Sequence, residues 1–280
     1  MNVLILTILI GLGSSVAGYL GSLTGLGGGF IIIPMLTLAF GVDIRYAIGT
    51  SLIAVIATSS GAAAAYVREG FSNIRIGMFL EIATTAGAVV GAFLALRLPT
   101  HAIAVIFGLV LMNSAYLSSR PQDESRRTQA SDRFAALLKM NGTYPTPHGP
   151  KSYGVRSVPA GFGLMAIAGV LSGLLGIGSG AVKVLAMDQA MRLPFKVSTA
   201  TSNFMIGVTA AASAGIYLNK GYIDPVLTMP VVLGVLIGSM LGARHLFGVE
   251  TRKLRTIFGA VIVVLAAQMI YSGLKGWIIK

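Results

Sequence analysis

The sequence predicts an all-α, polytopic transmembrane helical bundle of two inverted repeats. Three observations support this: high hydropathy with few charges, about ten long uncharged segments, and an internal repeat. The 280-residue chain has a mean hydropathy of +0.82, and only 11% of its residues are Asp, Glu, Lys or Arg. Soluble domains carry about 25% charged residues. So few charges cannot cover a soluble protein of this size, which excludes a cytosolic enzyme and favours the bilayer.

The net charge of +12 is not a nucleic-acid signal. Nucleic-acid binding requires Lys and Arg gathered on a soluble face with interleaved aromatic residues, and this chain offers no such face. The chain has no cysteine, so disulfides, thiolate metal sites and cysteine nucleophiles are excluded. We expect no nucleic-acid partner and no cofactor.

Long uncharged stretches define the expected membrane segments. Most approach the ~20 residues that a spanning helix needs. The segments cover residues 2–23, 26–41, 46–67, 76–96, 102–118, 158–175, 177–191, 197–218, 226–243 and 256–274.

Two of these segments, 26–41 and 177–191, are too short to span comfortably. Each begins at a glycine cluster and reaches only about 24 Å at 1.5 Å per residue. Irregular backbone inside a membrane is tolerated where it faces protein or a wet cavity. We therefore interpret both as broken or re-entrant helices.

A polar, basic linker at residues 119–157 divides the chain into a first repeat at 1–118 and a second at 158–280. If the linker is cytoplasmic and every segment crosses, the inner loops collect about fifteen Lys and Arg residues and the outer loops about five. This asymmetry predicts a multi-pass protein of the cytoplasmic (inner) membrane with a cytoplasmic linker and both termini outside.

An internal repeat relates the two halves. A shift of 151 residues aligns 18–70 with 169–221 without a gap and later pairs the G-x-x-x-G motif at 87–91 with that at 238–242. Five crossings per half is an odd number, so the second half would enter the membrane in the opposite sense. Inverted repeats are typical of secondary transporters, whose substrate sites lie where broken helices meet. A parallel repeat follows if a short segment does not cross.

The duplicated glycine motifs are the first candidate site. Glycine brings backbone N–H groups close to a ligand, and a helix that starts after it presents a positive dipole end to an anion. Close helix packing is the alternative. The candidate ligand-binding residues are Gly25, Gly27, Gly28 and Gly29 in the first half and Gly176, Gly178, Ser179 and Gly180 in the second.

Small hydroxyl residues form the second candidate site. Thr50 and Ser51 are repeated as Thr201 and Ser202, which Asn203 follows. Their hydroxyl and amide groups can hydrogen-bond an oxyanion without a fixed charge. Hydrogen bonds between helices are the alternative role.

Three charged residues lie inside the expected spans: Glu81, Lys183 and Asp188. Charged groups there are costly and usually mark pathways. Lys183, on the short segment after Gly176, is the sharpest candidate for an anion ligand; a structural ion pair with Glu81 or Asp188 is the alternative. Glu81 and Asp188 are candidate proton-coupling groups because burial favours protonated carboxyls.

No other chemistry is indicated. Methionines without Cys or His partners do not indicate a metal site, so we expect none. The three histidines lie in or beside loops, and no base and nucleophile can be grouped with them. We therefore expect no catalytic residues and no enzyme.

The motif Gly25-Leu26-Gly27-Gly28-Gly29-Phe30-Ile31-Ile32-Ile33-Pro34, its repeat from Gly176 to Leu185, and the Thr-Ser pairs resemble those of the TauE/SafE family, also called TSUP transporters. The likeness covers nearly the whole chain apart from the linker. It implies a secondary transporter, commonly an exporter, of sulfite, sulfoacetate or a related organosulfonate. The chain departs from the family motif at Ser179, Lys183 and Leu185.

The expected partners are a small anion, the lipid bilayer and a second copy in a homodimer. Proton coupling is part of this hypothesis. A carrier of a cation or another small molecule remains an alternative, as does a non-transporting membrane scaffold or an intramembrane enzyme.

Overall fold

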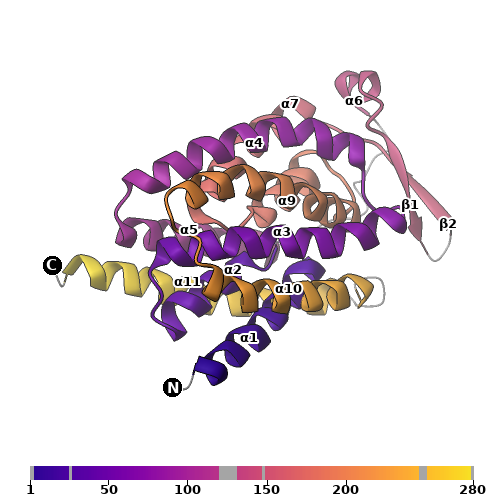
Figure 1. The fold of residues 1–280 in the computed structure, drawn as a ribbon. Coiled ribbons are helices and arrows are strands. Elements are labelled where there is room, and N and C mark those ends of the chain that lie inside the picture. Colours follow the sequence, from indigo (N-terminus) through magenta and orange to yellow (C-terminus); the bar gives the residue numbers. More distant parts are fainter. Residues whose placement is uncertain (1–2, 25–26, 120–130, 147–148, 246–250, 279–280) are drawn as a thin grey trace.

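The computed structural model describes residues 3–24, 27–119, 131–146, 149–245 and 251–278. These residues form a helical bundle with one small β-hairpin at its end (Figure 1). The helical prediction is therefore confirmed in its coarse form, as a mostly helical chain.

The first half contains five elements that follow the predicted segments. The short second element starts as an α-helix and ends in a π-helical turn. The bounds are α1 (Val3–Thr24), α2 (Gly29–Pro34) with η1 (Met35–Ala39), α3 (Ile44–Arg68), α4 (Ile74–Arg97) and α5 (Thr100–Ser119).

The second half has the same order of elements, including the short helix that ends in a π-helical turn. The bounds are α7 (Val158–Leu175), α8 (Gly180–Leu185) with η3 (Ala186–Ala190), α9 (Phe195–Asn219), α10 (Pro225–His245) and α11 (Thr251–Ile278).

Glycine and asparagine mark two of these helix boundaries. Asn73 caps the start of α4, because its side chain accepts a 3.1 Å hydrogen bond from the amide of Ile76. Gly176 ends α7 with a φ of +67°, which is the left-handed conformation that glycine adopts without strain. The sequence therefore sets both the start of α4 and the break between α7 and α8.

The short helices are too short to cross a bilayer. The six residues of α2 and the five of η1 rise about 16 Å, against ~30 Å for the hydrocarbon core. Within the described residues, five helices are long and apolar enough to cross a membrane, by length and composition: α1, α3, α4, α7 and α10.

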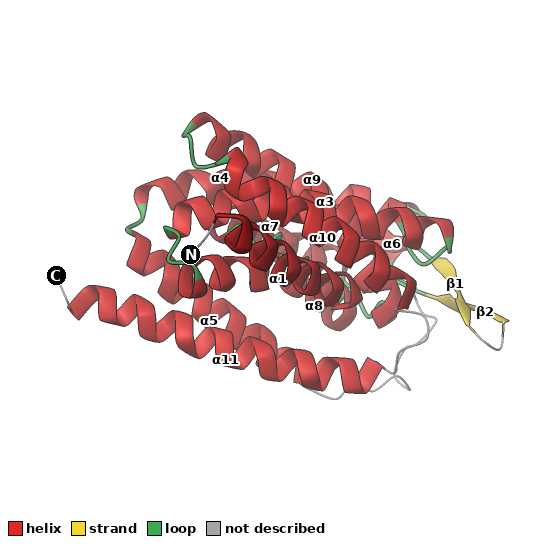
Figure 2. Ribbon diagram, turned by 60° about the horizontal axis from the view of Figure 1, so that its bottom comes forward, coloured by secondary structure: helices red, strands yellow, loops and turns green. Residues whose placement is uncertain are grey.

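The outer helices pack in two pairs, and each pair contains one helix from each half of the chain. α1 packs on α10 as α7 packs on α4, and a shift of 151 residues converts one pair into the other. α3 lies against α9 between these two layers (Figure 1). Figure 2 shows α11 along one side of the bundle beside α5, with which it packs.

Glycines bring the outer pairs into close contact. A Cβ atom placed on Gly87 or Gly91 of α4 would collide with the carbonyls of Ala166 or Val170 on α7. The equivalent G-x-x-x-G of α10 packs in the same way on α1, against the carbonyls of Ser15 and Tyr19. Both motifs therefore serve helix packing.

The linker contains structure that the sequence did not predict. Its described part forms a short helix, α6 (Arg133–Leu137), and an antiparallel hairpin of β1 (Gly142–Thr146) and β2 (Gly149–Tyr153). The hairpin is a departure from an all-α fold. Pro145 pairs with Pro150 in it, and proline disfavours a strand prediction.

This linker subdomain, the described residues 131–146 and 149–157, packs on the end of the bundle where α4 begins. Asn73 donates hydrogen bonds to the Met140 carbonyl at 2.9 Å and to the Tyr153 hydroxyl at 2.8 Å. Met140 and Val155 are buried in a cluster with α4 residues such as Ile76. Burial raises the pKa of Tyr153. The expected polar linker is thus partly folded, and its residues 120–130 lie outside the described part.

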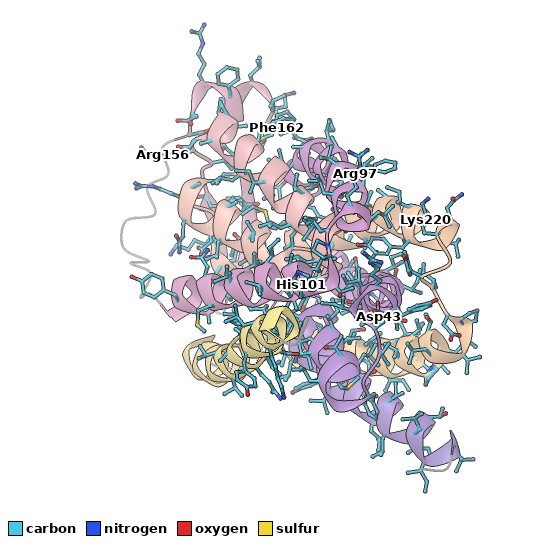
Figure 3. All side chains as sticks on the ribbon, turned by 90° about the vertical axis from the view of Figure 1, so that its left-hand side faces the viewer. Asp43, Arg97, His101, Arg156, Phe162 and Lys220 are labelled. Atoms are coloured by element: carbon cyan, nitrogen blue, oxygen red, sulfur yellow. The ribbon has the colours of Figure 1, made fainter. Side chains whose placement is uncertain are left out.

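The opposite end of the bundle carries the start of α1 and the end of α11 (Figure 1). Figure 3 views this end and labels Asp43, Arg97 and Lys220. The side chain of Arg45 donates a 3.1 Å hydrogen bond to the Leu98 carbonyl there, which ties the start of α3 to the end of α4.

Candidate functional site

The two glycine breaks meet at the centre of the bundle. Gly27 and Gly178 adopt φ values of +73° and +69°, and both lie against the side chains of Val55 on α3 and Ile206 on α9. A Cβ atom on Gly29 would lie 3.0 Å from the Gly176 carbonyl. The structure thus brings the predicted glycine sites of both halves together. Gly25 lies outside the described residues.

Ser179 and Gly28 are equivalent in the two repeats but differ in conformation. Gly28 has a φ of −70°, whereas Ser179 has a φ of +48°, which is uncommon for a residue with a side chain. The Ser179 hydroxyl is buried without a hydrogen-bond partner. Strained residues with free polar groups are frequent at functional sites.

The Thr-Ser pairs connect the breaks to the surrounding helices. Ser51 donates a 2.8 Å hydrogen bond to the Gly176 carbonyl, and Ser202 lies 3.4 Å from the Gly180 carbonyl. The Thr50 hydroxyl lies 3.2 Å from that of Thr228. All of these side chains are buried. In this conformation the hydroxyls bind protein groups.

The two threonines of these pairs differ in partner. Thr201 accepts a 3.0 Å hydrogen bond from the amide of Asn73, the residue that caps α4 and holds the hairpin. Thr50 instead faces the side chain of Thr228 on α10. A path of hydrogen bonds therefore leads from the linker subdomain to the Thr-Ser pair of α9.

Asn203 links α9 to the end of α1. Its side-chain amide donates to the carbonyls of Ser22 at 3.3 Å and Thr199 at 3.2 Å. Its backbone carbonyl accepts a hydrogen bond from Ser59 of α3. The side-chain oxygen of Asn203 is buried and has no partner, so one polar atom remains free at this crossing.

Lys183 and Glu81 form a buried ion pair between α8 and α4. The Nζ atom of Lys183 lies 3.8 Å from Oε2 of Glu81, and the Lys183 side chain is fully buried. Thr209 of α9 lies between them: its hydroxyl accepts a 2.5 Å hydrogen bond from Lys183 and donates one of 2.5 Å to Oε1 of Glu81. Thr85 donates to the same oxygen at 3.1 Å.

The ion pair stands beside the helix break of the second half. Lys183 lies one helical turn after the break, and its backbone amide donates a 3.0 Å hydrogen bond to the Ser179 carbonyl. Asp188, the other acidic candidate, lies on η3 with 6% of its surface exposed. It is buried rather than at the lipid surface.

Thr209 and Thr85 are the site residues that sequence reasoning missed. One signal was present: the repeat aligns Thr209 with Thr58, so a hydroxyl occupies this position in both halves. The residues equivalent to Lys183 and Glu81 are Ile32 and Val232. The ion pair therefore belongs to one half only, and the glycine breaks belong to both.

Metal chemistry has no support in the described part of the chain, where no group of three or more His, Cys, Asp or Glu residues could hold an ion. Two central helix breaks, a buried ion pair and long apolar helices define a polytopic membrane protein with a polar interior site.

Comparison with known proteins identifies the family. Residues 9–269 match the sequence model of the sulfite exporter TauE/SafE family. The chain is 27% identical over 267 residues to the Bacillus subtilis (strain 168) "Probable membrane transporter protein YunE", covering 92% of this chain and 95% of the relative. It is 25% identical over 275 residues to a "Probable membrane transporter protein" of Xylella fastidiosa (strain 9a5c), covering 97% of each. No solved structure gives a significant match.

The chain belongs to the TauE/SafE family. It is a multi-pass membrane transporter and not an enzyme, as the resemblance of its glycine motifs implied.

Proposed function

We propose that this transporter carries a small sulfur-containing oxyanion, such as sulfite, sulfoacetate or a related organosulfonate. One observation carries the proposal: a fully buried ammonium group, Lys183, lies beside the helix breaks. A buried cation in a transporter favours an anionic substrate, because an anion that reaches Lys183 can take the place of its present partner, Glu81. A cation carrier would instead be opposed by Lys183. The family description, sulfite exporter, supports the sulfur oxyanion and the exporting direction.

The anion binds, in this proposal, between the two glycine breaks and Lys183. Backbone amides at Gly27, Gly29 and Gly178 and the free hydroxyl of Ser179 supply hydrogen-bond donors. The polar side chains around them have one of two roles: they exchange their present protein partners for the substrate, or they hold the breaks in place. These residues are Thr50, Ser51, Thr201, Ser202 and Asn203.

We propose further that the two halves form an inverted repeat. The equivalent helices α5 and α11 support it, because they pack in opposite directions. Gly108, near the middle of α5, meets Ala266 of α11, whereas Gly273, later in α11, meets His101 at the start of α5. Two equivalent helices that run antiparallel are related by a two-fold axis perpendicular to both. If the helices cross the membrane, that axis lies in the plane of the bilayer, as it does in an inverted repeat.

Two tyrosines support the same relation between the halves. Tyr66 on α3 donates a 2.8 Å hydrogen bond to the Ser22 carbonyl of α1, and Tyr217 on α9 donates a 3.2 Å one to the Gly173 carbonyl of α7. The donor and the acceptor of the second hydrogen bond each lie 151 residues after those of the first. An inverted repeat needs an odd number of crossings in each half. In this arrangement each short helix, about half a membrane long, therefore completes its crossing together with the residues that flank it.

Flux in proteoliposomes tests the function. Purified protein should take up radiolabelled sulfite and sulfoacetate faster than empty vesicles, and a pH gradient should change the rate. Uptake of a monovalent cation instead would favour the cation carrier. Protein-dependent flux of neither sulfur oxyanion would contradict the proposed substrate class.

A further inference from the structure

One threonine hydroxyl joins the two buried charges. The Thr209 oxygen accepts a hydrogen from Lys183 and gives its single hydrogen to Oε1 of Glu81. The other carboxylate oxygen, Oε2, is buried without a hydrogen-bond partner and lies 3.8 Å from the ammonium nitrogen. The network as it stands holds one carboxylate beside one ammonium, with one oxygen of that carboxylate open to a proton.

The charges in this network must balance. Buried charges are stable only when paired, and Lys183 has no exposed surface with which to reach water. An oxyanion group that arrives beside Lys183 would add a second negative charge to a site that is already neutral. Two like charges at one buried cation repel, so one carboxylate or one oxyanion can occupy the place beside the ammonium, but not both.

We infer that Glu81 and the transported oxyanion compete for Lys183, so that Glu81 binds one proton whenever the anion binds, with Thr209 as the positioning residue. This inference rests on the proposed function. A proton from the aqueous phase bonds to Oε2 and makes the carboxyl neutral, while Lys183 keeps its charge and donates to the oxyanion. When the anion leaves, the proton leaves Glu81, and the ion pair forms again.

Other ionisable groups on the helices around the pair lie elsewhere along those helices. α7 carries no ionisable residue. α9 has Lys196 at its start and Tyr217 near its end, where the tyrosine bonds to Gly173. η3 holds Asp188, and α5 has His101 near its start and Tyr116 near its end. On α4 itself, Arg75 lies at the start and Arg97 at the end. Since the equivalents of Lys183 and Glu81 in the other half are the apolar Ile32 and Val232, the repeat does not duplicate this coupling pair.

Counting protons against anions tests the inference. The full chain is placed in proteoliposomes with labelled sulfoacetate outside and a pH-sensitive dye inside. Both acidic groups of sulfoacetate are ionised at neutral pH, so protons that enter with it are carried by the protein. We expect about one proton per sulfoacetate in the wild type. Glu81→Gln should admit sulfoacetate while the proton count falls to about zero.

The Thr209 variants keep the test decisive if Glu81→Gln does not fold. Thr209→Val removes the bridging hydroxyl but neither charge and should lower the proton count per anion, whereas Thr209→Ser should restore it. Ser114→Ala removes a buried hydroxyl of α5 that bonds to the Val110 carbonyl of its own helix, and it should keep the wild-type ratio.

The possible outcomes separate the two proposals. Sulfoacetate uptake without protons in the wild type overturns the coupling and leaves the proposed function standing. An unchanged proton count in Glu81→Gln, or in Thr209→Val, also overturns it. No protein-dependent entry of sulfoacetate into wild-type vesicles overturns the proposed function and the coupling with it.

Discussion

The hydroxyl of Ser51 donates a 2.8 Å hydrogen bond to the carbonyl of Gly176 and so joins α3 of the first half to the helix break of the second. Both groups are buried. The contact holds the two glycine breaks against each other, because Gly29 also lies beside the same carbonyl. A single side chain of α3 therefore contacts both breaks and holds them together.

Ser51→Ala should destabilise the protein. The substitution leaves the buried Gly176 carbonyl without this donor, which costs about 1–3 kcal/mol in the free energy of unfolding. Thermal unfolding in detergent, followed by circular dichroism, measures the change. Ser60→Ala is the matched control, because Ser60 is exposed on the same helix and bonds within it to Ile56. The control should stay within about 0.5 kcal/mol. Equal stability of both variants would contradict the role given to Ser51.

Lys183→Met should lower both stability and flux. Removing the ammonium leaves Glu81 as an unpaired buried charge, which costs about 3–5 kcal/mol. Adding Glu81→Gln removes that charge and should recover most of the stability. Flux of sulfoacetate should stay low in the double variant, since the anion still lacks its cation. Unfolding in detergent and uptake in vesicles measure the two effects separately.

The double variant separates a binding role for Lys183 from a purely structural one. If the ion pair only holds α8 against α4, a neutral pair of similar size should transport as the wild type does. Wild-type flux and affinity in Lys183→Met with Glu81→Gln would therefore contradict anion binding by Lys183.

Gly29→Ala should disturb the meeting of the two breaks. A Cβ atom at this position would lie 2.5 Å from the Ser51 hydroxyl and 3.0 Å from the Gly176 carbonyl, so the backbones must separate. Such overpacking costs about 1–3 kcal/mol. We expect reduced sulfoacetate flux and a lower unfolding temperature.

Gly163→Ala is the control for Gly29→Ala. Gly163 lies on α7, and a Cβ atom there meets nothing within 4 Å. It should transport normally and unfold at or slightly above the wild-type temperature, because alanine favours a helix over glycine. Equal flux in both variants would show that the close approach at Gly29 is not needed.

The helix breaks could be predicted from the sequence because local chemistry sets them. Gly27 and Gly178 take positive φ angles that most side chains resist, and the 151-residue repeat places them at equivalent positions. The short helices after them, α2 and α8, follow from the same glycines. Local signals of this kind do not depend on the rest of the fold.

The ion pair could be named only as an alternative, because tertiary packing decides it. Glu81 and Lys183 are far apart in the chain, and which acid meets the lysine depends on how α4 and α8 come together around α9. Thr209 is uncharged and lies in no glycine motif, so the sequence did not single it out. The hairpin was missed because Pro145 and Pro150 argue against strands, although they pair with each other across it.

The orientation of the protein in the membrane can be tested by cysteine labelling, because the chain contains no cysteine. Ser152 is exposed on β2 of the linker subdomain, and Lys220 is exposed after α9 at the other end of the bundle (Figure 3). The excess of basic residues predicts a cytoplasmic linker. A membrane-impermeant maleimide should therefore label Lys220→Cys in intact cells and label Ser152→Cys only after permeabilisation. Labelling of Ser152→Cys alone in intact cells would reverse the orientation. Labelling of both would mean that the helices between them do not carry the chain across the membrane, which their length and apolar surfaces argue against.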